Sequence, residues 1–362
     1  MLTILSFIVV LGVIIFVHEL GHFLAAKSVG IRVEQFSLGY PPKMIGYRRG
    51  DTEYCISWVP LGGYVKMSGM IDEGNQDEST LTGAPWEFAS KSWWQKLWVI
   101  LAGVLMNFIL AMLLYTGITA FKGIPEAEGP IVGAVSPATP AEQAGLEAGD
   151  RIVSIDGESL DTWEDLLNAV HPRPQEELTL VYDRAGELHE ATVTTLSQQI
   201  EIDGEWQAVG LIGISPQVTY RPATASEVLS SGVRGTGQVI NMVKTSLSML
   251  FTGRASVKDL GGPVLIAKMS GDSAREGLAH FLAFIAFISV NIGCLNLLPV
   301  PALDGGHALI ILTEAGIRRP LPNRLKIALQ QVGMLLLLGL ILFIIWNDVQ
   351  KVFGFEWLQK IF

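Results

Sequence analysis

The sequence predicts an α-helical polytopic membrane protein with four transmembrane helices, a membrane-associated β-hairpin or re-entrant segment, and one inserted α+β domain. Hydrophobic residues make up 49% of the 362 residues and charged residues only 17%, and the apolar residues are concentrated in blocks. Four of these blocks are long and apolar enough to cross a bilayer, which takes about 20 residues in a helix. Between the second and third blocks, short strand-like segments alternate with turns marked by glycine and aspartate.

Charge and cysteine content exclude other classes of protein. The net charge is −10 and no basic patch carries interleaved aromatic residues, so we expect no nucleic-acid partner. Cys55 and Cys294 are far apart in the sequence and offer neither a disulfide framework nor a cysteine-based metal site.

The first apolar block runs from about residue 2 to residue 26 and begins the first part of the membrane core, residues 1–121. A secretory signal peptide would start with a positively charged region, whereas no charged side chain here precedes His18. We therefore expect a transmembrane helix that the mature protein retains and that places the protein in a lipid bilayer.

This helix contains the motif His18-Glu19-x-x-His22. On a helix, His18 and His22 lie one turn apart on the same face, where both imidazoles can bind one zinc ion, and Glu19 can reach a water molecule on that metal. The alternative is a pair of hydrogen-bonded histidines in an ordinary buried helix. Because ionisable residues are costly inside a membrane and usually mark a functional site, the motif indicates an intramembrane zinc site.

Residues 27–95 are mixed and polar. Within them, segment 53–67 has short strand-like stretches that are broken by Pro60 and by a pair of glycines. The pattern fits a hairpin or a re-entrant sheet edge, and it fits a plain cytosolic loop equally well.

The second transmembrane helix is expected at about residues 97–121, with an interfacial belt of tryptophans at one end. The belt consists of Trp93, Trp94 and Trp98. Asn107 lies inside the helix, and we interpret it as an amide that bonds a neighbouring helix.

Residues 125–215 are predicted to form the inserted α+β domain. The pattern Ala-Gly-Leu-x-x-Gly-Asp-x-Ile-x-x-Ile-x-Gly at residues 144–157 resembles the PDZ domains of bacterial membrane proteases. Such domains add an extended peptide to a sheet edge and capture a C-terminal carboxylate. The alternative is that this domain acts only as a spacer or a steric filter.

Residues 216–280 are expected to form a linker with amphipathic helices, and 223–252 is either a helix along the membrane surface or a soluble linker helix. The second part of the membrane core, 281–362, contains the third and fourth spans at about 281–298 and 331–347. The third span runs into two prolines and two glycines, which predict a broken helix that lines a cavity or is buried in protein.

Lysine and arginine predict the orientation. They flank the spans at residues 27–96 and 318–326, which we therefore place on the cytoplasmic side, and the acidic 125–215 domain lies on the opposite side with both termini. The zinc motif and Asp304 then both lie near the cytoplasmic ends of helices that run inward, at a similar depth.

A catalytic zinc usually has three protein ligands and an open position. Asp304 is the best candidate for the third ligand, and the alternative is a turn residue, since Asp-Gly is a common turn pair. His307 is not included among the expected zinc ligands. We expect metal-assisted peptide hydrolysis in which Glu19 accepts the proton of the attacking water and passes it to the leaving amine.

A membrane helix must unwind before its peptide bonds can be cut. Asn296 is a candidate for binding the substrate backbone or the oxyanion, or else it is a helix-packing amide. The strand-like segment that includes Gly63, Tyr64 and Val65 is expected to hold the unwound substrate by edge pairing.

Together, these motifs resemble the site-2 protease family. The resemblance rests on the zinc motif in the first span, Asn-x-x-Pro-x-Pro-x-Leu-Asp-Gly-Gly-His at 296–307, Leu-Gly-Gly-Tyr-Val-Lys-Met at 61–67 and Leu-Gly-Gly-Pro-Val at 260–264. The resemblance covers nearly the whole chain and is closest to the branch of the bacterial proteases that regulate sigma-E. Well-known members of that branch carry two tandem PDZ domains, whereas this chain has room for one.

The resemblance implies zinc-dependent cleavage of single-pass membrane proteins, such as anti-sigma factors and remnant signal peptides, in a bacterial cytoplasmic membrane. It implies that His18, His22 and Asp304 are the zinc ligands and that Glu19 is catalytic. It also implies that Asn296, Pro299 and Pro301 contact the substrate.

Two other functions fit the sequence less well. A membrane scaffold that presents a PDZ domain has no reason to bury four ionisable ligand-type residues in lipid. A metal transporter would need further carboxylates along a path through the membrane, and the spans contain few.

Overall fold

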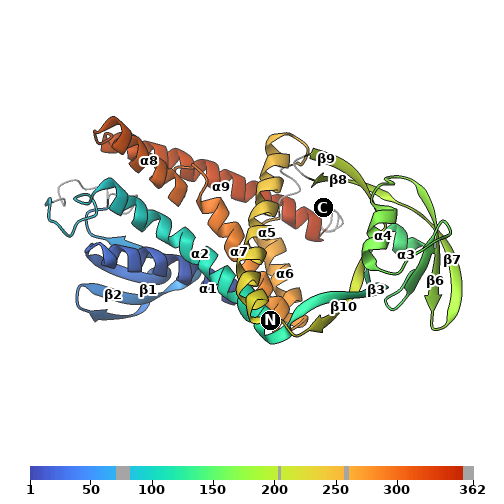
Figure 1. Cartoon of the computed structure of the whole chain (residues 1–362). Coiled ribbons are helices and arrows are strands. Elements are labelled where there is room, and N and C mark those ends of the chain that lie inside the picture. Colours follow the sequence, from blue (N-terminus) through green and yellow to red (C-terminus); the bar gives the residue numbers. More distant parts are fainter. Residues whose placement is uncertain (71–81, 203–204, 257–260, 354–362) are drawn as a thin grey trace, which may run out of the picture. The chain divides into compact units, whose positions relative to one another are not determined.

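The computed structural model describes the chain except for residues 71–81, 203–204, 257–260 and 354–362 (Figure 1). Two compact units are formed, one by Met1–Ile118 with Ala225–Phe362 and the other by Thr119–Thr224. The first unit contains α1 (Leu2–Ser28), β1 (Val33–Arg49), β2 (Thr52–Met67), α2 (Trp93–Lys122), α5 (Ala225–Phe251), α6 (Pro263–Arg275), α7 (Leu278–Asn296), α8 (Asp304–Ile317) and α9 (Asn323–Phe353).

Four helices in the described part of the chain are long and apolar enough to cross a membrane, which confirms the predicted number. They are α1, α2, α7 and α9. Helix α9 begins at Asn323, eight residues before the apolar block that predicted it, because its first two turns mix polar and apolar residues but are still helical. Leu335 and Leu336 on α9 are 68% and 69% exposed, as expected for side chains that contact lipid instead of protein.

Helices α1 and α2 approach closely because small residues lie where they meet. A Cβ atom added at Gly21 of α1 would lie 2.4 Å from the backbone oxygen of Ala102 on α2. On another part of its surface α1 packs against α7, where Val10 and Ile14 contact Ile288 in a buried apolar cluster.

Strands β1 and β2 form an antiparallel hairpin that packs against α1 (Figure 1). The alternative of a plain loop is therefore wrong, and the whole of β1 was missed. The first half of β1, Val33–Leu38, pairs with 53–56 on one side and with 63–67 on the other. Residues 63–67 thus form an edge of this sheet, and no described residue pairs with their free side.

Helix α5 packs one face against α2 and α7. Gly232 allows a close approach to α2, since a Cβ there would lie 2.4 Å from the Met112 oxygen. Val239 and Val243 share a buried cluster with Val290 of α7. This helix therefore packs against membrane helices. Neither interpretation of 223–252, a helix along the membrane surface or a soluble linker helix, predicted these partners.

Helices α6 and α8 were not predicted individually. Helix α6 follows Gly262 as its N-cap and has Pro263 in its first turn, where a missing N–H costs nothing; Leu260 of the same motif lies outside the described residues. Asp348 of α9, fully buried, accepts hydrogen bonds from the backbone N–H groups of Gly262 and Leu265 at 3.1 Å each. This carboxylate joins the start of α6 to α9.

The second unit has a mixed strand and helix content. Its elements are β3 (Ile124–Val135), α3 (Pro140–Gln143), β4 (Arg151–Ile155), β5 (Glu158–Ser159), α4 (Trp163–Val170), β6 (Glu177–Arg184), β7 (Glu187–Thr194), β8 (Leu196–Ile202), β9 (Glu205–Leu211) and β10 (Ile214–Arg221). The main sheet has the order β10-β3-β4-β6-β7, β5 pairs with β4, and β8 pairs with β9. Thr162 and Asp165 cap the start of α4 by a reciprocal pair of hydrogen bonds.

An ion pair between Asp150, just before β4, and Arg184, at the end of β6, stabilises this unit. Burial would raise the pKa of the Asp150 carboxyl, but hydrogen bonds from the Arg184 guanidinium at 2.7 Å and from the Glu147 backbone N–H outweigh it and hold that pKa below its usual range. Asp150 therefore stabilises the folded unit only while it is ionised.

Candidate metal centre

Three ligand-type side chains from the two ends of the chain meet in the first unit. The Nε2 atoms of His18 and His22 lie 3.2 Å apart, and Asp304 Oδ2 lies 3.1 Å from the first and 3.6 Å from the second. Both histidines are buried. Among the described residues, this is the group of histidine and carboxylate ligands that lies close enough to bind one metal ion.

The geometry of this cluster fits zinc. For tetrahedral coordination with bonds of about 2.0–2.1 Å, neighbouring ligand atoms lie about 3.3 Å apart. The three observed separations, 3.1, 3.2 and 3.6 Å, lie around this value. Asp304 Oδ2 is buried and has no hydrogen-bond partner in the described part of the chain, as expected for an oxygen that binds a metal.

Helix α2 orients the His22 ring. His22 Nδ1 lies 2.8 Å from the backbone oxygen of Val99, which can only accept, so Nδ1 carries the proton and Nε2 presents its lone pair to the cluster. Gly103, one turn later, leaves room for both rings. A Cβ there would lie 2.5 Å from His22 Nε2 and 2.8 Å from His18 Cε1.

Asn107 orients the other ring, a role that the sequence interpretation missed. Its amide lies 3.3 Å from His18 Nδ1, while its backbone oxygen accepts a hydrogen bond from Ser289 of α7 at 2.9 Å. The side-chain oxygen of Asn107 is buried without a partner in the described residues, and exchanging the amide N and O would let it accept the proton of His18 Nδ1. The prediction that Asn107 bonds a neighbouring helix is confirmed, because its amide lies beside His18 of α1; the sequence did not indicate that its partner is a metal-ligating ring.

The start of α8 holds Asp304. Helix α7 ends at Asn296, and prolines at 299 and 301 prevent its continuation. The chain then folds back over Gly305 and Gly306, where an added Cβ would lie 2.3 Å from the Leu297 oxygen and 2.2 Å from the Val300 oxygen. The glycine pair therefore permits close packing within a helix and does not form the turn that its composition suggests.

Glu19 lies next to the edge strand of the hairpin. A Cβ added at Gly63 would lie 3.0 Å from Glu19 Cγ, so the Glu19 side chain packs against the face of the sheet at Gly63, a residue of the edge segment of β2. Tyr64 stacks on Tyr40 with ring centroids 6.4 Å apart, and Val65 packs with the apolar cluster at the end of α1.

The remaining predicted residues separate into two groups. Asn296 lies at the cluster, with its amide nitrogen 3.5 Å from His18 Nε2. Pro301 contacts α9, because a Cβ at Gly333 would lie 3.1 Å from its Cβ. Pro299 lies in the short segment between α7 and α8. His307, which was excluded as a ligand, instead lies 3.4 Å from Gln330 in a separate cavity.

Comparison with known proteins shows similarity over nearly the whole chain. The family described as Peptidase family M50 matches residues 6–340. A protein of Agrobacterium fabrum, for which a zinc metalloprotease activity is proposed, is 37% identical and covers 97% of this chain and 96% of its own length. Zinc metalloprotease RasP of Geobacillus kaustophilus is 31% identical over 97% of this chain and 98% of its own length. The regulator of sigma-W protease RasP of Bacillus subtilis is 30% identical, with coverages of 97% and 99%.

Proposed function

Because the chain belongs to peptidase family M50 and is a zinc metalloprotease with helices that can span a membrane, we propose that it cleaves peptide bonds inside the transmembrane segments of single-pass membrane proteins. The observation that carries this proposal is the cluster of His18, His22 and Asp304, whose three ligand atoms have the spacing of a zinc site. These three residues are the proposed ligands, and Glu19 is the proposed general base.

A zinc ion held by His18, His22 and Asp304 would supply a Lewis acid that could polarise the scissile carbonyl and favour ionisation of a water molecule. The Glu19 carboxylate takes the proton of the attacking water and then delivers it to the nitrogen of the leaving amine. The amide of Asn296, beside His18, is placed to donate a hydrogen bond to the substrate carbonyl oxygen. Asn107 and the Val99 carbonyl keep the two imidazoles in the tautomers that the metal requires.

The edge strand explains how a helical substrate can be presented. A helix hides its peptide bonds, whereas an extended segment paired with residues 63–67 would expose them beside Glu19. Gly63 has no side chain that would keep such a strand away from the carboxylate. We therefore propose that Gly63, Tyr64 and Val65 bind the unwound substrate through their backbone, with Pro299 and Pro301 shaping the opposite wall.

The substrates that fit this chemistry are single-pass proteins with little extracytoplasmic mass, including anti-sigma factors and remnant signal peptides. We propose that the second unit is a single PDZ domain on the extracytoplasmic side of a bacterial cytoplasmic membrane, where it filters substrates by size or binds their C-termini. The metal centre would then lie toward the cytoplasmic face.

The test separates chemistry from metal binding. Glu19→Gln should lower cleavage of a single-pass substrate by at least about 100-fold while the protein retains about one zinc per chain. Asp304→Ala and His22→Ala should lose the zinc as well as the activity, and Glu276→Gln, at an exposed helix end, should lose neither. Full cleavage by Glu19→Gln would refute the assigned base, and full zinc content in Asp304→Ala would refute the ligand set.

A further inference from the structure

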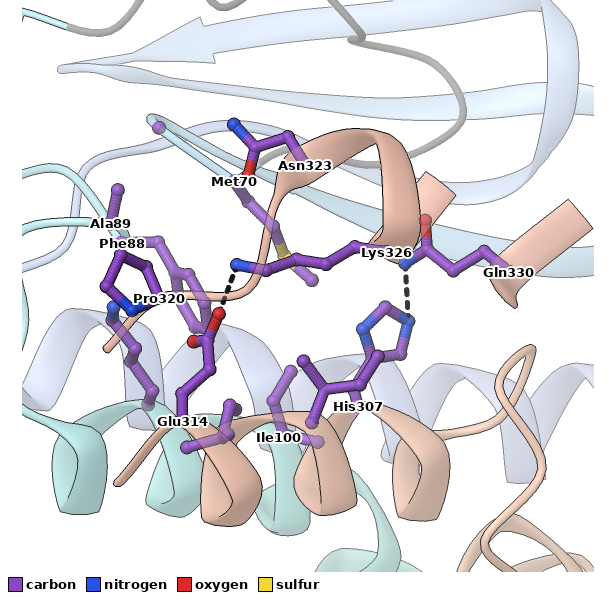
Figure 2. Close-up of a pocket in the computed structure, with 14 residues that line it drawn as sticks. Met70, Phe88, Ala89, Ile100, His307, Glu314, Pro320, Asn323, Lys326 and Gln330 are labelled. Atoms are coloured by element: carbon purple, nitrogen blue, oxygen red, sulfur yellow. Dashed lines mark hydrogen bonds and ion pairs between the residues drawn. The ribbon is translucent and has the colours of Figure 1, made fainter. Parts of the chain in front are cut away.

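A cavity of about 290 Å³ lies apart from the metal centre, between the start of α2, helix α8 and the start of α9 (Figure 2). Its apolar walls include Met70, Phe88 and Ile100. Polar side chains line the rest of it, and Figure 2 shows Lys326 reaching from α9 to Glu314 on α8, and Gln330 facing His307. This size suits a polar head group or a small anion more than a large ligand.

The cavity carries one positive charge that has no ionic partner. Its charged lining consists of Lys96, Lys326 and Glu314. Lys326 is paired with Glu314 at 2.6 Å, whereas Lys96 forms no ion pair within the part of the chain that the structure describes. The remaining charge of +1 matches a ligand with a single negative charge, such as a phosphodiester.

The carboxylate that lines the cavity, Glu314, is already paired with a cation. Both groups that Glu314 Oε1 contacts are donors, the Lys326 ammonium and the backbone N–H of Leu321 at 2.8 Å. By contrast, the side-chain oxygen of Gln330, a residue only 7% exposed, is buried and has no hydrogen-bond partner among the described residues. A ligand hydroxyl would satisfy this oxygen.

The surroundings of the cavity have the features of a membrane interface. Trp93 and Trp94, just before Lys96 on α2, are 52% and 56% exposed, as is typical of tryptophans at the depth of lipid head groups. Apolar side chains along the same part of α9 are also exposed and offer a surface to an acyl chain. These side chains are Leu325, Leu329 and Val332.

We propose that this cavity binds the head group of an anionic phospholipid of the phosphatidylglycerol type. Its phosphodiester would pair with Lys96, and a glycerol hydroxyl would donate a hydrogen bond to Gln330. A zwitterionic lipid brings a cation that would have to compete with Lys326 for Glu314, the carboxylate that lines this cavity, so we expect the site to discriminate between the two lipid classes.

The test uses the full-length protein, stripped of lipid in detergent and examined by native mass spectrometry. Phosphatidylglycerol, phosphatidylcholine, glycerol 3-phosphate and inorganic phosphate are titrated separately. We expect one tightly held phosphatidylglycerol, with affinity at least about tenfold above that for phosphatidylcholine. Lys96→Gln should weaken phosphatidylglycerol binding by at least about tenfold and Lys96→Arg should restore it, because a charge-assisted hydrogen bond from a half-buried side chain is lost and regained.

Arg324→Gln is the matched control, because Arg324 is an exposed cation in the first turn of α9 that does not line the cavity. Equal losses in Lys96→Gln and Arg324→Gln would overturn the site and leave only general surface attraction. Equal retention of the two lipids by the wild-type protein would also overturn it, even if Lys96→Gln does not fold. Binding of glycerol 3-phosphate or inorganic phosphate as tightly as the lipid would overturn the membrane as the source of the ligand.

Discussion

The replacement of Gly103 by alanine tests whether α2 controls the metal centre through the space that it leaves. Gly103 belongs to neither the zinc motif nor the substrate-binding residues. It lies on α2, one turn before Asn107, and faces both imidazoles.

The size of the effect follows from the distances. The new methyl carbon would lie 2.5 Å from His22 Nε2, and ordinary contact begins at 3.4 Å, so the ring nitrogen must move by about 0.9 Å. Zinc–ligand distances vary by only about 0.2 Å. The ring cannot rotate away freely, because its Nδ1 is bonded to the Val99 oxygen on the same helix as the new methyl group. We therefore expect Gly103→Ala to weaken zinc binding by at least about 100-fold.

Zinc affinity is measured by competition with a chelator, followed by metal analysis of the purified protein. Gly117→Ala is the control on the same helix, because a Cβ there meets no atom within 4 Å. It should bind zinc as the wild type does. Wild-type zinc affinity in Gly103→Ala would show that the rings are not confined by α2 and would refute the geometric argument.

Three further substitutions test other parts of the structure. Asn107→Ala should lower zinc affinity by about 10–100-fold in the chelator assay, whereas Asn291→Ala, whose amide bonds its own helix, should not; equal affinities would remove Asn107 from the site. Gly306→Ala should cost about 1–3 kcal/mol in thermal unfolding and reduce cleavage, since its Cβ would lie 2.2 Å from a backbone oxygen, while Gly316→Ala meets no atom and should do neither. Asp150→Asn should destabilise the second unit by about 2 kcal/mol at pH 7, measured by hydrogen exchange of β4 and β6. The folded-state pKa of Asp150 is lowered, so its contribution to the free energy of unfolding is complete above the unfolded pKa of about 3.9 and is lost as the pH falls through the folded value. The difference in stability between wild type and variant should therefore shrink at pH 3. A difference that persists unchanged at pH 3 would exclude the ionised carboxylate as its cause.

The cluster at the metal centre could be predicted because its chemistry restricts both residue type and spacing. His18 and His22 must lie one helical turn apart to share a metal, and Asp304 is a carboxylate at the matching membrane depth. The role of Asn107 could not be predicted in the same way. A polar residue in an apolar helix has the same sequence pattern whether its amide bonds a helix or a histidine ring.

The missed elements have a similar explanation. The sequence at Asp304-Gly-Gly resembles a turn, but helix α8 begins there. The structure shows why the two following residues are glycines, because the backbone oxygens of Leu297 and Val300 lie where their side chains would be. Strand β1 was missed because the pair Pro41-Pro42 interrupts its alternation. The cavity brings together Lys96 and Gln330, which are far apart in the sequence and carry no local pattern.

The separation of the metal-centre residues along the chain also sets the order in which the protein can mature. About 280 residues lie between His22 and Asp304, so the ribosome needs between about 14 and 56 s to make the third side chain after the second. During that interval α1 is already available to the membrane, but it carries only two of the three groups of the cluster. A nascent chain thus cannot assemble the proposed zinc site until Asp304 has been made, so its neighbours in the bilayer meet an incomplete site during that interval.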